Sequence, residues 1–357
     1  MKPLALLFTV LFLATTAQSV LAADVVGVKT MAVPSPARGR DLAVTIWYPA
    51  TPGGAEVRVG ENKLFQGAPA LADAPLAPGR FPLILVSHGS GARIENLGWI
   101  ANRLVAAGFI VAGPNHPGTT SGDSTPIDTP NVWERTDDLS TLLTALTESP
   151  DWRGALAGQR VGVLGFSLGG TTAMELAGAI PDREAYARYC DTYPAMMDCV
   201  WFAGGKGYVD GEAVPSQKVD LRQMDKRRFE QSNRDPRIAS AVLVDPGMAK
   251  AFQPASLAAI AIPMHFINLG GPGTVPPGVV AEDLARLTPR GDYAQVDGAV
   301  HFTFLAECQP GGKALLAAIG EADRLCDDGG SRPRAAMHAE LGDRIAADFT
   351  RDLKGAP

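Results

Sequence analysis

Ser167 lies at the centre of a G-F-S-L-G pentapeptide, residues 165–169, that is followed by another glycine. Apolar residues 161–164 precede the pentapeptide directly, and a helical pattern over 168–179 follows it. A serine between a buried strand and a helix stands on a strained turn that lifts its hydroxyl above the sheet, and glycines leave room for that turn. We therefore predict that Ser167 is a nucleophile. The alternative is a serine that only caps a helix after a glycine turn.

A serine hydroxyl is a poor nucleophile unless a base accepts its proton, and the chain has five histidines. His301 follows the expected last strand, 293–296, which is where a nucleophile on this kind of turn finds its base. We predict that His301 is the general base. The other four are expected in two loops after strands, in a strand as a core residue, and at the surface of a C-terminal helix: His88 and His116, His265, and His338.

The histidine needs a carboxylate that fixes its tautomer and balances its developing charge. Asp245 directly follows the expected strand 241–244, and the carboxyl ends of parallel strands face the active edge of such a sheet. We predict Asp245 as this acid. Glu282 and Asp283, after the next expected strand, are the alternatives, and Asp245 itself can be interpreted as the first residue of an Asp-Pro-Gly turn.

Hydrolysis through a serine requires two backbone N–H donors for the tetrahedral oxyanion. Leu168, directly after the nucleophile, is predicted to supply one of them. Ser90, in the H-G-S-G-A segment 88–92 after the expected strand 82–86, is predicted to supply the other. His116 should lie beside the same edge and is a candidate for substrate contact, although a plain turn is an equal interpretation.

Short apolar runs alternate with helical patterns along the chain, which predicts a mainly parallel sheet with helices on both faces. The expected strands are 41–48, 82–86, 109–112, 161–165, 241–244, 262–269 and 293–296. The expected helices are 96–107, 132–146 and 168–179, with a mostly helical tail from residue 313. We expect a single α/β domain over 23–357.

Residues 186–237 show no strong periodicity, and we interpret them as an insertion that covers the sheet edge as a lid. Trp201 and Phe202 in this insertion, together with Trp133, are candidates for contact with an apolar substrate. Packing of the lid onto the sheet is an equally good interpretation of these aromatic side chains.

The first residues have the form of a secretory signal peptide, with Lys2, an apolar stretch over 4–15 and small residues before a cleavage point near Ala22. The apolar stretch is too short to span a bilayer as an anchor, which is the alternative interpretation. We therefore expect a periplasmic or secreted protein without a stable membrane anchor.

An oxidising compartment favours disulfides between the four cysteines, for which three pairings exist. We expect Cys190–Cys199 and Cys308–Cys326, because the members of each pair are close in sequence. A zinc site is the alternative, and it is disfavoured because the sequence has no C-x-x-C pair.

The composition, with 46% hydrophobic and 20% charged residues, is that of a folded globular chain. The net charge of -6 argues against nucleic-acid partners, which need a basic face. The sequence has no H-E-x-x-H, no phosphate loop and no G-x-G-x-x-G after a strand, so we expect no metal and no other cofactor. It leaves the oligomeric state open.

Taken together, these features resemble secreted α/β-hydrolases of the dienelactone-hydrolase-like and platelet-activating-factor-acetylhydrolase-like branch. The matching segments are I-W-Y-P at 46–49, the segments 88–92 and 165–170, Asp245 after its strand, and H-F at 301–302. The resemblance implies the α/β-hydrolase fold and an acid at Asp245. Cytosolic dienelactone hydrolases are less similar, because they carry a cysteine where Ser167 stands.

This resemblance implies a hydrolase more clearly than it implies a substrate, because the branch includes lipid esterases and periplasmic hydrolases of oxidised polyvinyl alcohol. We expect a serine hydrolase of carboxylic esters that acts on a small-molecule or polymer acyl substrate. Hydrolysis of a β-diketone carbon–carbon bond with the same triad is the first alternative, and amide cleavage the second. A binding protein without catalysis is disfavoured, because nucleophile, base, acid and oxyanion loop are all present.

Overall fold

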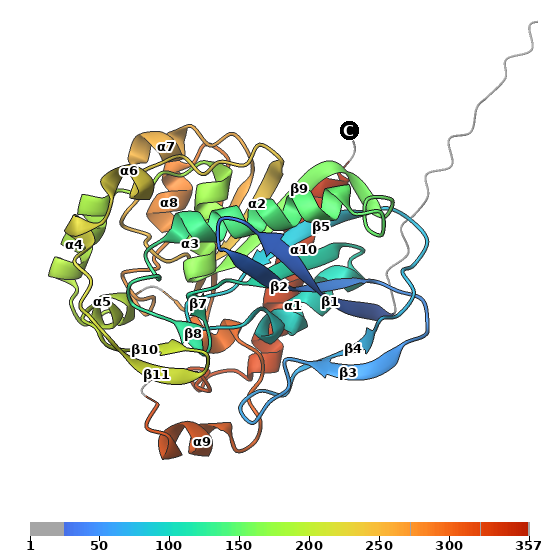
Figure 1. The fold of residues 1–357 in the computed structure, drawn as a ribbon, viewed down its shortest axis with the longest axis horizontal. Helices are drawn as coiled ribbons and strands as arrows, with labels where there is room; N and C mark the ends of the chain where they lie inside the picture. The colour runs from blue at the N-terminus through green and yellow to red at the C-terminus, as the bar shows by residue number, and fades with distance from the viewer. Residues whose placement is uncertain (1–24, 272, 322, 356–357) are drawn as a thin grey trace, which may run out of the picture.

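A ten-stranded sheet forms the centre of the computed structural model, which describes residues 25–271, 273–321 and 323–355 (Figure 1). The expected signal peptide, residues 1–22, lies outside the described residues. From one edge to the other the strands are β14 (Gly291–Val296), β13 (Met264–Leu269), β12 (Ile238–Val244), β9 (Leu156–Phe166), β5 (Phe81–Ser87), β6 (Ile110–Asn115), β2 (Arg40–Pro49), β1 (Val26–Ser35), β4 (Ala68–Ala72) and β3 (Ala55–Val59). The neighbours from β14 to β6 are all parallel, and β6, β2 and β1 pair antiparallel. The predicted mainly parallel sheet is thus confirmed.

The central strands form where the sequence has continuous apolar runs, because both faces of the sheet are covered. Every residue of β5 is buried, and its side chains alternate between two cores. Leu83 and Leu85 belong to one core, whereas Ile84 and Val86 belong to the other. A strand of this kind cannot have polar residues at alternate positions.

Helices cover each face of the sheet (Figure 1). One core includes α2 (Val132–Glu148) and α3 (Leu168–Ala177), and the other includes α1 (Gly98–Ala106) and α10 (Arg334–Lys354). In α2 the leucines at 139, 142, 143 and 146 are fully buried, as their helical spacing predicts. Among the described residues, no helix combines the length and the apolar character needed to cross a membrane.

A smaller sheet lies beside the loop that follows β5 and includes part of the 186–237 segment. Its strands are β11 (Glu212–Ser216), β10 (Gly205–Val209), β8 (Asp123–Ser124) and β7 (Thr119–Thr120). The rest of that segment forms α4 (Arg183–Thr192), α5 (Met197–Phe202), η2 (Leu221–Gln223) and α6 (Lys226–Phe229). The Cys190–Cys199 disulfide joins α4 to α5. The weak periodicity of this sequence therefore reflects short elements, not an irregular loop.

The C-terminal tail is mostly helical, as its sequence predicts. It contains α9 (Gly312–Ala318) and the long α10, and the residues between them form turns and bends. The Cys308–Cys326 disulfide holds this connection. Both predicted disulfides are therefore present. The remaining short elements are η1 (Ile94–Leu97), α7 (Pro254–Ala258), α8 (Glu282–Leu287) and η3 (His301–Phe304).

The expectation that His338 lies at the surface was wrong. Its ring stacks on Trp99 with centroids 3.8 Å apart, and its Nε2 lies 2.7 Å from the Thr303 carbonyl oxygen. Burial lowers the pKa of His338 to about 4, so the ring is neutral at pH 7. A helix that covers a sheet can bury a polar side chain when another segment supplies a hydrogen-bond partner for it.

Candidate active site

Ser167 stands on the tight turn that joins β9 to α3. Its backbone has φ 54° and ψ −120°, a conformation that residues other than glycine rarely adopt. The glycines around it are required by close backbone contacts: a Cβ atom on Gly169 would overlap the Ser87 carbonyl oxygen, and one on Gly170 would lie 2.6 Å from the Pro246 Cα. The turn can therefore form only with glycine at these two positions.

His301 and Asp245 lie next to this serine in one hydrogen-bonded chain. The Ser167 Oγ is 3.2 Å from His301 Nε2, and His301 Nδ1 is 2.9 Å from Asp245 Oδ2. With its hydrogen on Nδ1, the imidazole donates to the carboxylate and turns the Nε2 lone pair toward the serine hydroxyl. The arrangement can accept the serine proton as the hydroxyl attacks a carbonyl carbon.

Asp245 is completely buried at the end of β12, and its side chain has little freedom. Its Oδ1 accepts hydrogen bonds from Asn268 Nδ2 at 2.8 Å and from the Leu269 N–H at 2.9 Å. Both donors come from the end of β13. Since Oδ1 is occupied, Oδ2 is left to receive His301.

Neither of the alternative acids has a comparable position. Glu282 and Asp283 begin α8, and the Asp283 side chain is exposed and pairs with Arg286 at 2.7 Å. The carboxylate that the fold brings to His301 is Asp245.

Backbone N–H groups from two segments are available beside the serine. Leu168 is the first residue of α3, and the N–H groups of a first helical turn have no partner within the helix. The 88–92 loop approaches from the other side, since a Cβ on Gly89 would lie 3.3 Å from the Ser167 Cβ. Ser90 follows in this loop and is exposed. The two predicted oxyanion donors thus belong to segments that lie next to Ser167.

The four residues predicted to contact substrate have different surroundings. Trp201 is half-buried and donates from Nε1 to the Thr129 hydroxyl at 2.9 Å. Trp133 is buried beneath the Arg228 guanidinium, which lies 5.6 Å from its ring. Phe202 is also buried and packs edge-on against Tyr186, so the expectation that it contacts substrate is corrected: its ring belongs to the core.

The expectation of substrate contact by His116 is also corrected, because both of its ring nitrogens are occupied in the core. Nε2 lies 3.0 Å from the Ser87 hydroxyl oxygen and Nδ1 lies 2.9 Å from the Asp138 carboxylate. None of the His116 surface is exposed. Burial, reinforced by the charge of Arg135, holds the pKa of His116 well below its usual value, so the ring is neutral.

Sequence reasoning missed the buried polar groups around Arg135. The side chain of Arg135 is 1% exposed and bonds to Thr172 and Thr119. A signal was present in the spacing, because residues 135 and 138 lie on the same face of α2 as the buried leucines at 139 and 142. Charged residues on an apolar helical face indicate internal partners.

Another carboxylate, Asp323, comes within electrostatic reach of His301 from the connection between α9 and α10. Burial raises the pKa of Asp323, Glu321 adds to this effect, and His301 opposes it. The connection closed by the Cys308–Cys326 bridge therefore brings a carboxyl group near His301.

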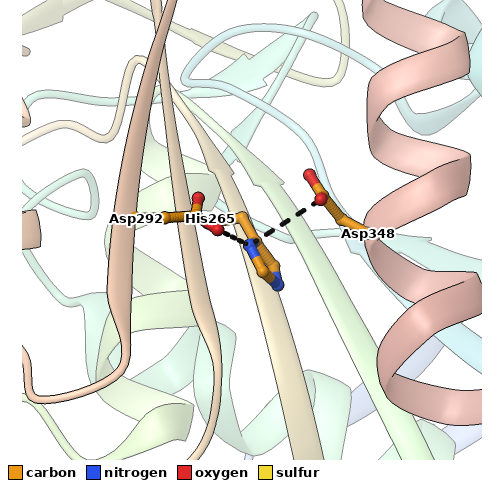
Figure 2. Close-up of side chains that lie close together, drawn as sticks. All are labelled: His265, Asp292 and Asp348. Carbon is orange, nitrogen blue, oxygen red and sulfur yellow. Dashed lines mark hydrogen bonds and ion pairs between the residues drawn. The ribbon is translucent and has the colours of Figure 1, made fainter. Parts of the chain in front are cut away.

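Three side chains of the kinds that bind metal ions, His265, Asp292 and Asp348, lie close together (Figure 2). His265 and Asp292 stand near the starts of β13 and β14, whereas Asp245 follows the end of β12. His265 on β13 has its Nδ1 2.7 Å from Asp292 and 3.9 Å from Asp348, and its Nε2 2.7 Å from Asp352. The Arg351 guanidinium lies 2.9 Å from Asp348 and 3.3 Å from the imidazole, where it neutralises part of this acidic group. The cluster ties α10 to the sheet, and His265 is a core residue with paired nitrogens, as expected.

Comparisons with known proteins agree with this architecture. No family model matches the sequence. Over 121 residues the chain is 28% identical to a bis(hydroxyethyl) terephthalate hydrolase of Streptomyces coelicolor, a match that covers 34% of this chain and 36% of the relative's length. The structure resembles that of a ferulic acid esterase from Streptomyces cinnamoneus, with a TM-score of 0.61 and 20% identity over 93% of this chain and 91% of that one. The likeness shows that the two chains share the α/β fold.

Proposed function

We propose that this protein is a serine hydrolase of carboxylic esters, with Ser167 as nucleophile, His301 as general base and Asp245 as the acid that orients it. The observation that carries the proposal is the continuous chain of contacts at 3.2 and 2.9 Å between these three side chains. The strained turn at the serine supports it, since backbone strain of this kind is concentrated at functional sites.

In the first half of the reaction, the Ser167 oxygen bonds to the ester carbonyl carbon while its proton moves to His301 Nε2. The carbonyl oxygen becomes an oxyanion that accepts hydrogen bonds from the N–H groups of Leu168 and Ser90. The carbon–oxygen bond to the alcohol then breaks, and the alcohol leaves with the proton from His301. An acyl group remains on the serine.

In the second half, a water molecule gives a proton to His301 Nε2 and adds to the acyl carbon. The bond to the Ser167 oxygen breaks, the serine recovers the proton, and a carboxylic acid is released. Asp245 balances the imidazolium that forms twice per turnover.

Esters of aromatic acids are the substrates that we propose to test first. The relative from Streptomyces coelicolor is named for a terephthalate diester, and the structural neighbour for ferulic acid. The half-buried Trp201 of the 186–237 segment leaves part of an aromatic ring exposed, and an aromatic acyl group would pack well on such a ring. The placement within the dienelactone-hydrolase-like branch rests on the sequence segments alone.

Export to the periplasm or medium is part of the proposal. The two disulfides support it, because such bonds persist in oxidising compartments. Protein N-terminal sequencing after secretion from a host that recognises the leader should give a chain that begins near residue 23. Retention of the leader on the exported chain would contradict this cleavage site.

Labelling with a fluorophosphonate tests the nucleophile. The probe should modify the wild type and not the Ser167→Ala variant, while the exposed-serine control Ser232→Ala should be labelled like the wild type. Continued labelling of Ser167→Ala would exclude this serine as the nucleophile.

A rate panel of aryl benzoates, aliphatic esters and a linear β-diketone tests the substrate. The benzoates should have the highest kcat/KM, and faster cleavage of the diketone would replace ester hydrolysis as the function.

A further inference from the structure

Arg135 joins the two segments that carry the proposed oxyanion donors. On one side its Nε donates to the Thr172 hydroxyl at 3.1 Å, and that hydroxyl donates to the Leu168 carbonyl oxygen at 3.1 Å in the first turn of α3. On the other side its Nη2 donates to the Ser87 hydroxyl oxygen at 3.1 Å and to the His88 carbonyl oxygen. The rigid guanidinium fork therefore bridges the turn after the nucleophile and the loop after β5.

The imidazole of His88 carries this constraint to the Ser90 N–H. The His116 backbone N–H lies 3.2 Å from His88 Nε2 and makes that nitrogen an acceptor, so the ring hydrogen is on Nδ1. Nδ1 then donates to the Gly89 carbonyl oxygen at 2.7 Å. That carbonyl and the Ser90 N–H belong to one planar trans peptide, so fixing the first fixes the direction of the second.

The hydrogen-bond directions around His116 leave the Ser87 oxygen free to accept from Arg135. Since His116 is neutral, Nδ1–H donates to Asp138 and the Ser87 hydroxyl donates to Nε2, which leaves the Ser87 oxygen to accept from Arg135. Arg38 in turn holds Asp138 through two hydrogen bonds of 2.9 and 2.8 Å. Each donor in this chain has one acceptor.

This chain has the residue types of a second Ser-His-Asp triad, but it is not a second active site. The side chains of Ser87, His116 and Asp138 are fully buried. Arg135 also occupies the hydroxyl oxygen that would have to attack. Arg135 must therefore act by holding other residues in place.

We infer that Arg135 is a positioning residue of the oxyanion hole, which sets the separation and direction of the Leu168 and Ser90 N–H groups. The inference rests on the proposed function. It predicts that a change at Arg135 weakens stabilisation of the oxyanion and leaves the nucleophile and base in place.

The test compares an aryl ester with its thionoester, in which sulfur replaces only the carbonyl oxygen and is a poor hydrogen-bond acceptor. Arg135→Lys keeps the charge and loses the fork. We expect kcat/KM for the ester to fall about 10- to 100-fold, less than the roughly 100- to 1,000-fold loss from removing a whole donor. The thionoester rate should change much less, so the ester-to-thionoester ratio should fall toward one.

Two further variants keep the test decisive. Arg103→Lys makes the same change at an exposed arginine and should keep the wild-type ratio. Thr172→Val removes the acceptor on α3 with little change of volume, so it tests the same bridge if Arg135→Lys fails to fold. Rates are expressed per active site titrated with fluorophosphonate, which removes the effect of misfolded protein.

Equal losses for ester and thionoester in both Arg135→Lys and Thr172→Val, or unchanged rates, would overturn the inference. Failure of the proposed function is separate, because the wild type would then hydrolyse neither compound. If the wild type cleaves the ester well and the variants keep the wild-type ester-to-thionoester ratio, only the positioning role is refuted.

Discussion

Glu175 offers a quantitative test of the packing behind the nucleophile. It lies on α3, two turns after Ser167, and is 1% exposed. Its Oε2 accepts a hydrogen bond of 2.6 Å from Asn233, whereas its Oε1 is buried without a partner among the described residues. Burial raises the pKa of Glu175 from 4.5 to about 8, and the bond from Asn233 opposes the rise only in part.

The consequence for stability follows from proton linkage. Between about pH 4.5 and pH 8 the folded state keeps a proton on Glu175 that the unfolded state has released. The unfolded state therefore binds fewer protons, and the free energy of unfolding falls as the pH rises through this window. The pKa difference, 8 − 4.5 = 3.5, corresponds to roughly 5 kcal/mol at most above pH 8.

Glu175→Gln should remove this loss because the amide has the same shape and no charge. Urea unfolding with the disulfides intact should give similar free energies of unfolding for both proteins near pH 5, and a variant more stable by a few kcal/mol near pH 9. Glu212→Gln, an exposed change on β11, should track the wild type. A Glu175→Gln advantage that does not grow with pH would refute the reasoning.

Three further predictions concern the site and its supports. Asp245→Asn should lower kcat about 10⁴-fold in steady-state assays, whereas Asp283→Asn should leave kcat unchanged. A loss only in Asp283→Asn would show that Asp283, and not Asp245, is the acid. Gly169→Ala should abolish activity or yield of folded protein because its Cβ would overlap a backbone oxygen, whereas Gly154→Ala, in open space, should be folded and active by circular dichroism and rate. Replacing both cysteines of the Cys308–Cys326 bridge, which stand 18 positions apart in sequence, should lower the free energy of unfolding by about 3 kcal/mol in urea titrations, and no loss would show that the bridge restrains little.

The sequence allowed the centre of this fold to be predicted, because its strands are continuous apolar runs bounded by glycine and proline. It was much less informative about β1, β3 and β4, which the predictions left out. In β3 the residues are exposed or half-buried, so the strand forms through its pairing with β4 and has no strong hydrophobic pattern of its own. Such edge strands depend on tertiary contacts.

The residues of the candidate site were predictable to the extent that they stand at strand ends. Ser167, Asp245 and His301 each follow a strand of the parallel sheet directly or within a short loop, so their convergence could be expected from topology. Arg135 and His88 could not be assigned in this way. Most of their partners come from segments distant in sequence, and only the folded chain shows to which carbonyl oxygen each of them donates.

The position of Asp245 at the end of β12 has a consequence for how this protein can diversify. The end of β13 supplies the Asn268 amide and the Leu269 N–H to the acid. The connection from β13 to α8 holds that amide in turn, because Asn268 donates to the Val279 carbonyl oxygen at 2.7 Å and accepts from the Ala281 N–H at 2.9 Å. Among the described residues of this connection, 273–277 make no hydrogen bond to Ser167, Asp245, His301 or Asn268. The length and composition of this stretch can therefore change while the contacts that hold Asp245 stay intact.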